Sequence, residues 1–115
     1  MTIARTELVE RIRELLLQRQ VRVDKADLCA SIIAESTADG VISHGIARLP
    51  RLLDQIDAGD IDPAAEPVKL DAPSAPAMEG YDGHRGIGIS NAAFAADRAM
   101  ALAGESGIGM VALRN

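Results

Sequence analysis

The feature that most constrains this chain is the helical spacing of apolar residues in its first half. Residues 6–19, TELVERIRELLLQR, place Leu8, Ile12, Leu15 and Leu16 on one face of a helix, with the charged residues elsewhere. Apolar side chains at spacings of three and four form the buried stripe of an amphipathic α-helix. The chain therefore has to bury this stripe against other elements of its own fold.

Two further segments repeat the pattern and predict a helical first half. Residues 25–38, KADLCASIIAESTA, form the second helix, with its buried face predicted at Leu28, Ile32 and Ile33. The third helix carries its apolar stripe at Ile46, Leu49, Leu53 and Ile56. The polar residues Thr6 and Asp24 are the predicted N-caps of the first and second helices. Gly40 and Gly59 mark the predicted ends of the second and third helices.

The second half of the chain has a different pattern. Residues 67–88 are punctuated by Pro and Gly and predict short strands and turns, residues 90–106 predict a helix that begins at Ser90 or Asn91, and residues 110–113 predict a strand. The fold class is therefore α/β (α+β): a three-helix segment over residues 1–60, then short strands, a helix and a strand over residues 61–115.

The last predicted strand is a continuous apolar run, which is typical of an interior strand that pairs on both sides. An apolar strand edge left open promotes aggregation. We therefore expect the chain to be a piece of something larger or to pair with another chain.

Composition excludes several classes of function. The chain has one Tyr, one Phe, no Trp and a net charge of −5, which argues against a nucleic-acid partner because stacking platforms and a basic surface are missing. No segment is apolar enough to span a membrane, and the charged start of the chain does not resemble a signal peptide. The single Cys29 lies in an apolar helical stretch and is predicted to be buried, so we expect a reduced, cytoplasmic protein.

The stretch VISHGIARLP, residues 41–50, holds the most reactive pair of side chains. His44 and Arg48 are four residues apart and share one face if a helix has begun by His44. A His can exchange a proton near neutral pH, and an Arg can hold a carboxylate with two hydrogen bonds. Because a nearby Arg opposes the protonated form of His, a carboxylate partner is expected. Asp39 is the local candidate, and a carboxylate from elsewhere is an equal alternative.

The same residues have a second interpretation, in which Ser43 caps the helix while His44 and Arg48 only solvate its flank. Neighbouring positions of an α-helix do not face each other, so Ser43 is not expected to act with His44 as a nucleophile and base. From spacing alone both interpretations of the pair stay open.

Other signals are weaker. Residues 83–90, GHRGIGIS, lack the third Gly of a dinucleotide-binding fingerprint, so we predict a tight turn that leads into a helix, with His84 exposed. The two His residues and Cys29 have no metal-ligand spacing, and we predict no metal site.

The segment ADGVISHGIARLPRLLDQIDAGDIDPAAEPV resembles the signature of the malate/L-lactate dehydrogenase family, which also includes 2,3-diketogulonate reductase and piperideine-2-carboxylate reductase. YDGHRGIG and AADRAMALAGESGIGMVALRN resemble the segments that follow it in the family. The likeness covers essentially the whole chain, which corresponds to about the first third of a family member. A Ser-Asn-His-like segment that usually comes next is absent, and Asp39 directly precedes Gly40 where the family has Asp-Leu-Arg-Gly.

The resemblance implies a fold other than the Rossmann fold, and the interconversion of a 2-oxo acid and a 2-hydroxy acid with NAD or NADP. It implies that His44 protonates the substrate and that Arg48 binds the substrate carboxylate. It also implies a homodimer, or pairing with a second polypeptide that completes the fold. The alternative is a non-catalytic helical interaction module, or an inactive remnant, descended from such an enzyme.

Overall fold

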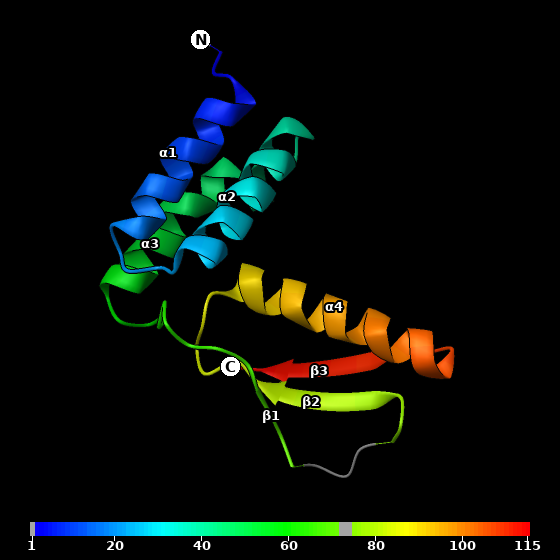
Figure 1. Ribbon diagram of the computed structural model, residues 1–115. Helices are drawn as coiled ribbons and strands as arrows, with labels where there is room; N and C mark the ends of the chain where they lie inside the picture. The colour runs from blue at the N-terminus through cyan, green and yellow to red at the C-terminus, as the bar shows by residue number, and fades with distance from the viewer. Residues whose placement is uncertain (1, 72–74) are drawn as a thin grey trace. The chain divides into compact units, whose positions relative to one another are not determined.

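The computed structural model describes residues 2–71 and 75–115, and these form two compact units. The first unit runs up to Ala64 and the second from Ala65 onward. Three helices make up the first unit, and short strands, a helix and a final strand make up the second (Figure 1). The predicted fold class is confirmed. The prediction of two domains divided after residue 60 stays a prediction, because a compact unit need not be an independent domain.

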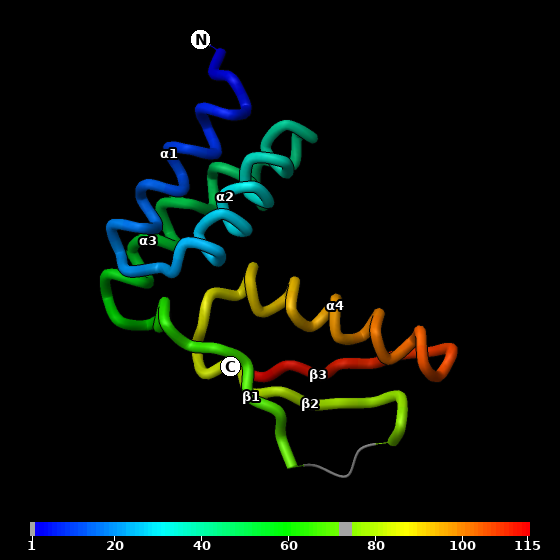
Figure 2. The backbone as a smooth tube through the Cα atoms, in the orientation of Figure 1, coloured from blue at the N-terminus to red at the C-terminus, as the bar shows by residue number. Residues whose placement is uncertain are grey.

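The first unit consists of α1 (Arg5–Leu17), α2 (Val23–Ala38) and α3 (Leu49–Asp57). The trace in Figure 2 shows α1 and α2 running side by side, joined by a short loop. Of the predicted stripe on α1, Ile12 and Leu16 are fully buried, because they lie at the centre of the face toward α2. On α3 the buried residues are Leu49, Leu52 and Ile56, so Leu52 takes the place predicted for Leu53. Ile46, also predicted on this stripe, precedes α3.

The buried face of α2 differs from the prediction. Cys29 and Ile33 are fully buried together with Ala26 and Ala30, whereas Leu28 is 39% exposed. Small residues let two helices approach closely, so α2 turns its Ala and Cys side chains inward and leaves a bulkier Leu near the surface. The prediction that Leu28 belongs to the buried face was therefore wrong, and the prediction that Cys29 is buried is confirmed.

The helix starts also differ from the prediction, whereas the stops agree. α1 and α2 begin after Ala4 and Arg22, and neither Thr6 nor Asp24 caps them. Asp24 lies in the first turn of α2, where it accepts hydrogen bonds of 2.5 and 2.9 Å from Arg22. These bonds hold the pKa of Asp24 down, at about 2. Gly40 and Gly59 follow α2 and α3 with φ of +81° and +80°, a conformation that favours glycine.

The second unit is a small sheet with one helix on it. Its strands are β1 (Val68–Lys69), β2 (Met78–Asp82) and β3 (Met110–Arg114), in that order across the sheet. β1 and β2 are antiparallel, and β2 and β3 are parallel. Two parallel strands need a long connection. Here α4 (Gly88–Ser106) provides it and lies along one face of the sheet (Figure 1).

A buried ion pair fastens α4 to the sheet. Glu79 on β2 has a side chain only 7% exposed, and it accepts hydrogen bonds of 2.6 and 2.7 Å from Arg98 on α4. The Tyr81 hydroxyl donates to the same carboxylate over 2.7 Å, and Lys69 donates to it over 3.0 Å. Arg98, Tyr81 and Lys69 together hold the pKa of Glu79 well below its ordinary value, despite its burial. The Tyr81 ring also meets Phe94 of α4 edge-on, with centroids 4.9 Å apart.

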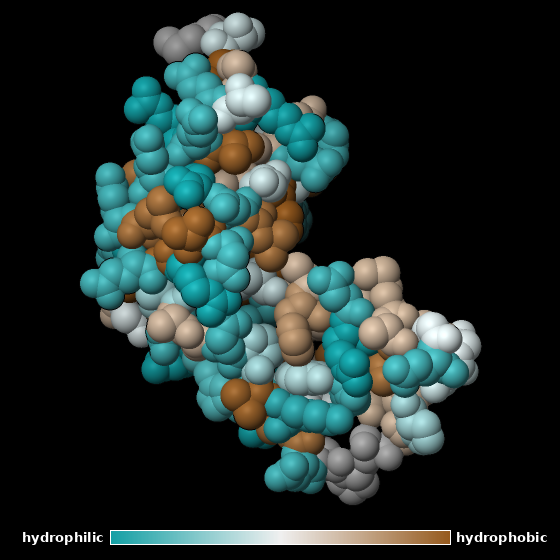
Figure 3. Space-filling view, viewed as in Figure 1, coloured by the Kyte–Doolittle hydropathy of each residue, from teal (hydrophilic) through white to brown (hydrophobic). Residues whose placement is uncertain are grey.

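The opposite face of this sheet carries exposed apolar side chains, beside the ion pair of Asp82 and Arg114. Alternate residues of a strand point to opposite faces, so Met78 and its partner Met110 face away from Glu79 and Tyr81. Met78, Met110 and Val68 are 45%, 53% and 54% exposed. Figure 3 shows apolar atoms interrupting the hydrophilic surface. Among the described residues β3 pairs only with β2, so the predicted pairing on its second side stays a prediction.

Within the described residues, no helix is both long and apolar enough to cross a membrane.

Candidate active site

The segment that joins α2 to α3 carries the predicted active-site pair. It contains two short 3₁₀-helices, η1 (Ile42–His44) and η2 (Ile46–Arg48), and α3 begins only at Leu49. Gly45 separates the two turns with φ −102° and ψ −132°, which is not a helical conformation. The expectation that His44 and Arg48 project from one continuous α-helix was therefore wrong. Each residue instead ends its own turn.

His44 is exposed, and its ring contacts Ser43. The Ser43 hydroxyl oxygen lies 3.2 Å from His44 Nδ1, within hydrogen-bond distance. Among the residues described, no group hydrogen-bonds the second ring nitrogen, Nε2. A histidine held at one nitrogen and open at the other can present that second nitrogen to a bound molecule.

The contact between Ser43 and His44 corrects two expectations. Ser43 does not cap a helix, because Val41 precedes η1 and no side chain caps it. The rule that neighbouring residues do not face each other describes an α-helix, and a single 3₁₀ turn allows a short hydroxyl to reach the next ring. The sequence carried no signal for this contact beyond the adjacency of the two residues.

Arg48 and Asp39 are exposed, and neither forms an ion pair or side-chain hydrogen bond in the described ranges 2–71 and 75–115. Asp39 is the residue after α2, and the structure does not bring its carboxylate to His44. By contrast, Arg19 holds Asp57 through hydrogen bonds of 2.8 and 3.0 Å. The guanidinium of Arg48 is thus uncommitted within the unit and available to an anion.

Two exposed apolar residues precede the Ser43–His44 pair in the chain. Val41 and Ile42, the two residues before Ser43, are each 48% exposed. Exposed large apolar side chains beside polar reactive groups are typical of surfaces that bind a ligand or another part of a protein.

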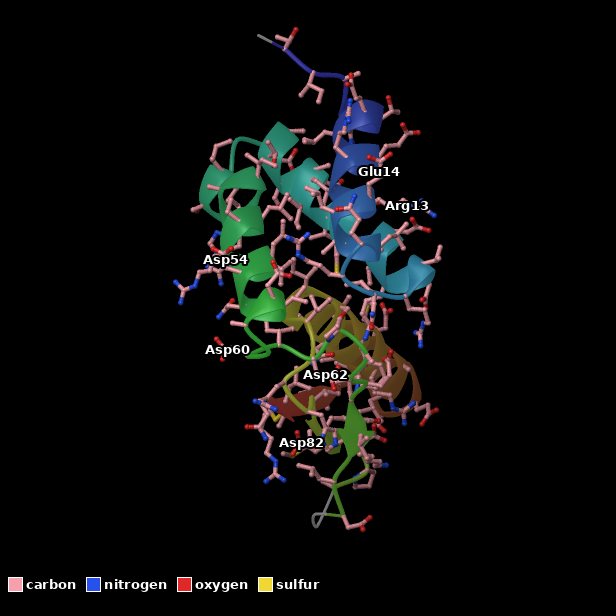
Figure 4. The ribbon with its side chains drawn as sticks, turned by 90° about the vertical axis from the view of Figure 1, so that its left-hand side faces the viewer. Arg13, Glu14, Asp54, Asp60, Asp62 and Asp82 are labelled. Atoms are coloured by element: carbon pink, nitrogen blue, oxygen red, sulfur yellow. The ribbon has the colours of Figure 1, made fainter. Side chains whose placement is uncertain are left out.

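The turn after β2 is the second feature that the sequence singled out. His84 and Arg85 have φ of +51° and +57°, and His84 is exposed as predicted. Asp82 holds the turn: it accepts a 2.8 Å bond from the His84 amide and a 3.0 Å bond from Arg114 Nε. These bonds lower the pKa of Asp82, with the His84 amide as the main cause. Figure 4 shows Asp82 beside β3, and sequence reasoning missed this role.

The glycines of this turn pack closely against other parts of the second unit. A Cβ on Gly83 would lie 2.6 Å from the Asn115 carbonyl oxygen, and one on Gly86 would lie 3.1 Å from the Gly83 carbonyl oxygen. The side-chain amide nitrogen of Asn91 is as close, 2.5 Å from the same point at Gly83, so neither glycine has room for a side chain. The Gly86 amide donates to the Gly83 carbonyl over 2.9 Å and α4 begins at Gly88, so the predicted tight turn that leads into a helix is confirmed.

No three His, Cys, Asp or Glu side chains come together as metal ligands in the part of the chain that the structure describes.

The chain belongs to the malate/L-lactate dehydrogenase family, whose model matches residues 3–115. The resemblance noted in the sequence is thereby confirmed. The 2,3-diketo-L-gulonate reductases of Mannheimia succiniciproducens and Klebsiella pneumoniae are each 44% identical to it over 115 residues, which is 100% of this chain and 34% of each relative.

Solved structures agree with these sequence relatives. Malate dehydrogenase from Pyrococcus horikoshii OT3 is 26% identical with a TM-score of 0.94, and the match covers 100% of this chain and 32% of that one. Sulfolactate dehydrogenase from Methanocaldococcus jannaschii is 28% identical with a TM-score of 0.90, covering 100% and 33%. The chain thus spans about a third of the length of the relatives it matches.

Proposed function

We propose that this chain supplies the proton donor and the carboxylate anchor of an NAD- or NADP-dependent oxidoreductase that interconverts a 2-oxo acid and a 2-hydroxy acid. The observation that carries the proposal is the segment 42–48, which presents an exposed His44 and an uncommitted Arg48 on consecutive turns. Membership of a dehydrogenase family supports it.

We assign the role of proton donor to His44. Its Nδ1 is engaged by Ser43, so Nε2 is the atom that meets the substrate carbonyl oxygen. When the carbonyl carbon accepts hydride, negative charge develops on that oxygen, and the Nε2 proton neutralises it to give the hydroxyl group. In the reverse direction the same nitrogen removes the hydroxyl proton.

We assign to Arg48 the binding of the substrate carboxylate. A guanidinium donates two parallel hydrogen bonds to a carboxylate and fixes its orientation. The relatives are named for diketogulonate, malate and sulfolactate, which all carry a carboxylate next to the carbon that changes oxidation state. Asp39 is kept as a weaker candidate to pair with His44 when substrate binds.

The nicotinamide cofactor supplies the hydride when bound. Because GHRGIGIS lacks the third Gly of a dinucleotide-binding fingerprint, we assign cofactor binding to the portion of the fold that relatives have beyond the matched third. We propose that this portion, in the same or a second polypeptide, covers the apolar face around Met78 and Met110, and that the complete protein is a cytoplasmic homodimer.

The test is oxidation of NADH and NADPH with 2-oxo acids by the complete protein, meaning this chain together with that remaining portion. We expect His44→Asn to lower kcat by about 10²–10⁴-fold, the usual contribution of a proton donor. Arg48→Ala should raise KM, because it removes the carboxylate anchor.

His84→Asn is the matched control, since His84 is the other histidine, and Asn tolerates its left-handed backbone. Its kcat should stay within about twofold of the unchanged protein, because surface changes have small effects. Full activity in His44→Asn would exclude the proposed role. Absence of turnover with every 2-oxo acid would favour the alternative of a non-catalytic interaction module.

A further inference from the structure

The side chains of the turn that carries His44 do little to fix its position. Residues 42–44 are all exposed, and a single 3₁₀ turn is a weak element. Its backbone is attached at one side, where the Val41 amide donates to the Ser36 carbonyl over 2.9 Å. A second attachment is needed to fix where the turn ends.

Thr37, in the last turn of α2, provides that second attachment. Its hydroxyl donates to the Ile33 carbonyl over 2.7 Å and accepts a 2.9 Å hydrogen bond from the Ile46 amide. Ile46 begins η2, so its amide is one of the donors that a helix start leaves without a partner. Thr37 therefore caps η2 from nine residues upstream.

Because Gly45 has no side chain, the backbone after His44 can approach Thr37 closely. A Cβ at Gly45 would lie 2.9 Å from the Thr37 backbone nitrogen, and nearer still to its hydroxyl oxygen. The backbone on the carboxyl side of His44 is thus pressed directly against Thr37. With Val41 tied to Ser36 and Ile46 tied to Thr37, residues 42–44 form a short bridge between two fixed points.

We propose that Thr37 is a positioning residue for His44: its hydroxyl fixes the turn from which the imidazole projects. The effect on catalysis rests on the proposed function, in which His44 is the proton donor. The hydrogen bond between Thr37 and the Ile46 amide does not depend on that function. A proton donor has to lie within hydrogen-bond reach of the reacting oxygen, and small displacements of such groups cost rate.

The experiment compares Thr37→Val, which keeps the shape and removes the hydroxyl, with Thr37→Ser, which keeps the hydroxyl. In the 115-residue chain, Thr37→Val should accelerate hydrogen exchange of the Ile46 amide by about ten- to hundredfold, because that donor loses its acceptor. Thr37→Ser should leave the exchange rate nearly unchanged. Thr6→Val is the matched control, since Thr6 lies exposed on α1.

In the complete protein, Thr37→Val should lower kcat about tenfold, as expected for losing one hydrogen bond, with KM nearly constant. Thr37→Ser should restore it. A merely structural role would instead reduce the amount of folded enzyme and leave kcat per active site unchanged.

Two results would overturn the proposal: unchanged Ile46 exchange in Thr37→Val, or accelerated exchange with unchanged kcat. Failure of the proposed function looks different, because the His44→Asn variant would then be as active as the unchanged protein. In that case Thr37 would still hold the turn, as judged by exchange, but would not position a proton donor.

Discussion

At the scale of single residues, Gly45 shows how one missing side chain determines the geometry of a candidate site. It lies between two 3₁₀ turns and is buried against Thr37. The i, i+4 spacing of His44 and Arg48 led to the expectation of one helix face. That expectation failed because spacing says nothing of a non-helical ψ between the two residues.

Replacing Gly45 by Ala should therefore destabilise the first unit. The added methyl group would have to displace the Thr37 backbone, and overpacking of this kind costs about 1–3 kcal/mol. Urea unfolding, followed by NMR signals of the unit that carries the substitution, measures this change in the free energy of unfolding.

Gly104→Ala is the control, because a Cβ there meets no atom within 4 Å and the position is helical. That variant should be more stable by about 0.5–1 kcal/mol. If Gly45→Ala were equally stabilising, the close contact with Thr37 would not exist in solution.

At the scale of elements, the ion pair between Glu79 and Arg98 joins strand to helix in the second unit. Because Arg98 and Tyr81 lower the pKa of Glu79 in the folded state, the ionised carboxylate stabilises the fold. This contribution is complete above the ordinary carboxyl pKa of 4.5 and is lost as pH falls from there through the lowered value.

We expect Glu79→Gln to lower the thermal unfolding midpoint at pH 7 by several degrees, because it removes the charge that Arg98 binds. The same variant should lose less stability than the unchanged chain when the pH falls below about 4.5. Circular dichroism melts across that range measure both effects. Glu105→Gln, an exposed change on α4, should follow the unchanged chain, and a Glu79→Gln profile with the original acid dependence would contradict the assignment.

The elements show what the sequence can and cannot predict. The stripe of α1, and that of α3 at Leu49 and Ile56, were found because large apolar residues recur at helical spacing. Leu28 was misplaced because side-chain size alone cannot reveal that α2 packs through its Ala and Cys residues. The bonds from Thr37 to Ile46 and from Arg98 to Glu79 connect residues far apart in the chain, and no local pattern encodes them.

At the scale of the whole molecule, the chain carries a candidate site in one unit and an uncovered sheet face in the other. It spans about a third of the relatives it matches. Its exposed His44 and the uncommitted guanidinium of Arg48 are the groups that we propose as proton donor and anion anchor. The sheet of the second unit likewise has one face covered by α4 and one face open.

Methionine oxidation tests whether the remaining portion of the fold covers that open face. Met78 and Met110 are paired on the open face, whereas Met100 lies on α4 and is 64% exposed. With dilute peroxide, all three should oxidise readily in the 115-residue chain alone. In the complete protein, Met78 and Met110 should become at least severalfold slower relative to Met100, because burial excludes the oxidant. Mass spectrometry of the digested protein gives each rate. Equal rates for Met78 and Met110 in the chain alone and in the complete protein would mean that the open face stays exposed and that the rest of the fold attaches elsewhere.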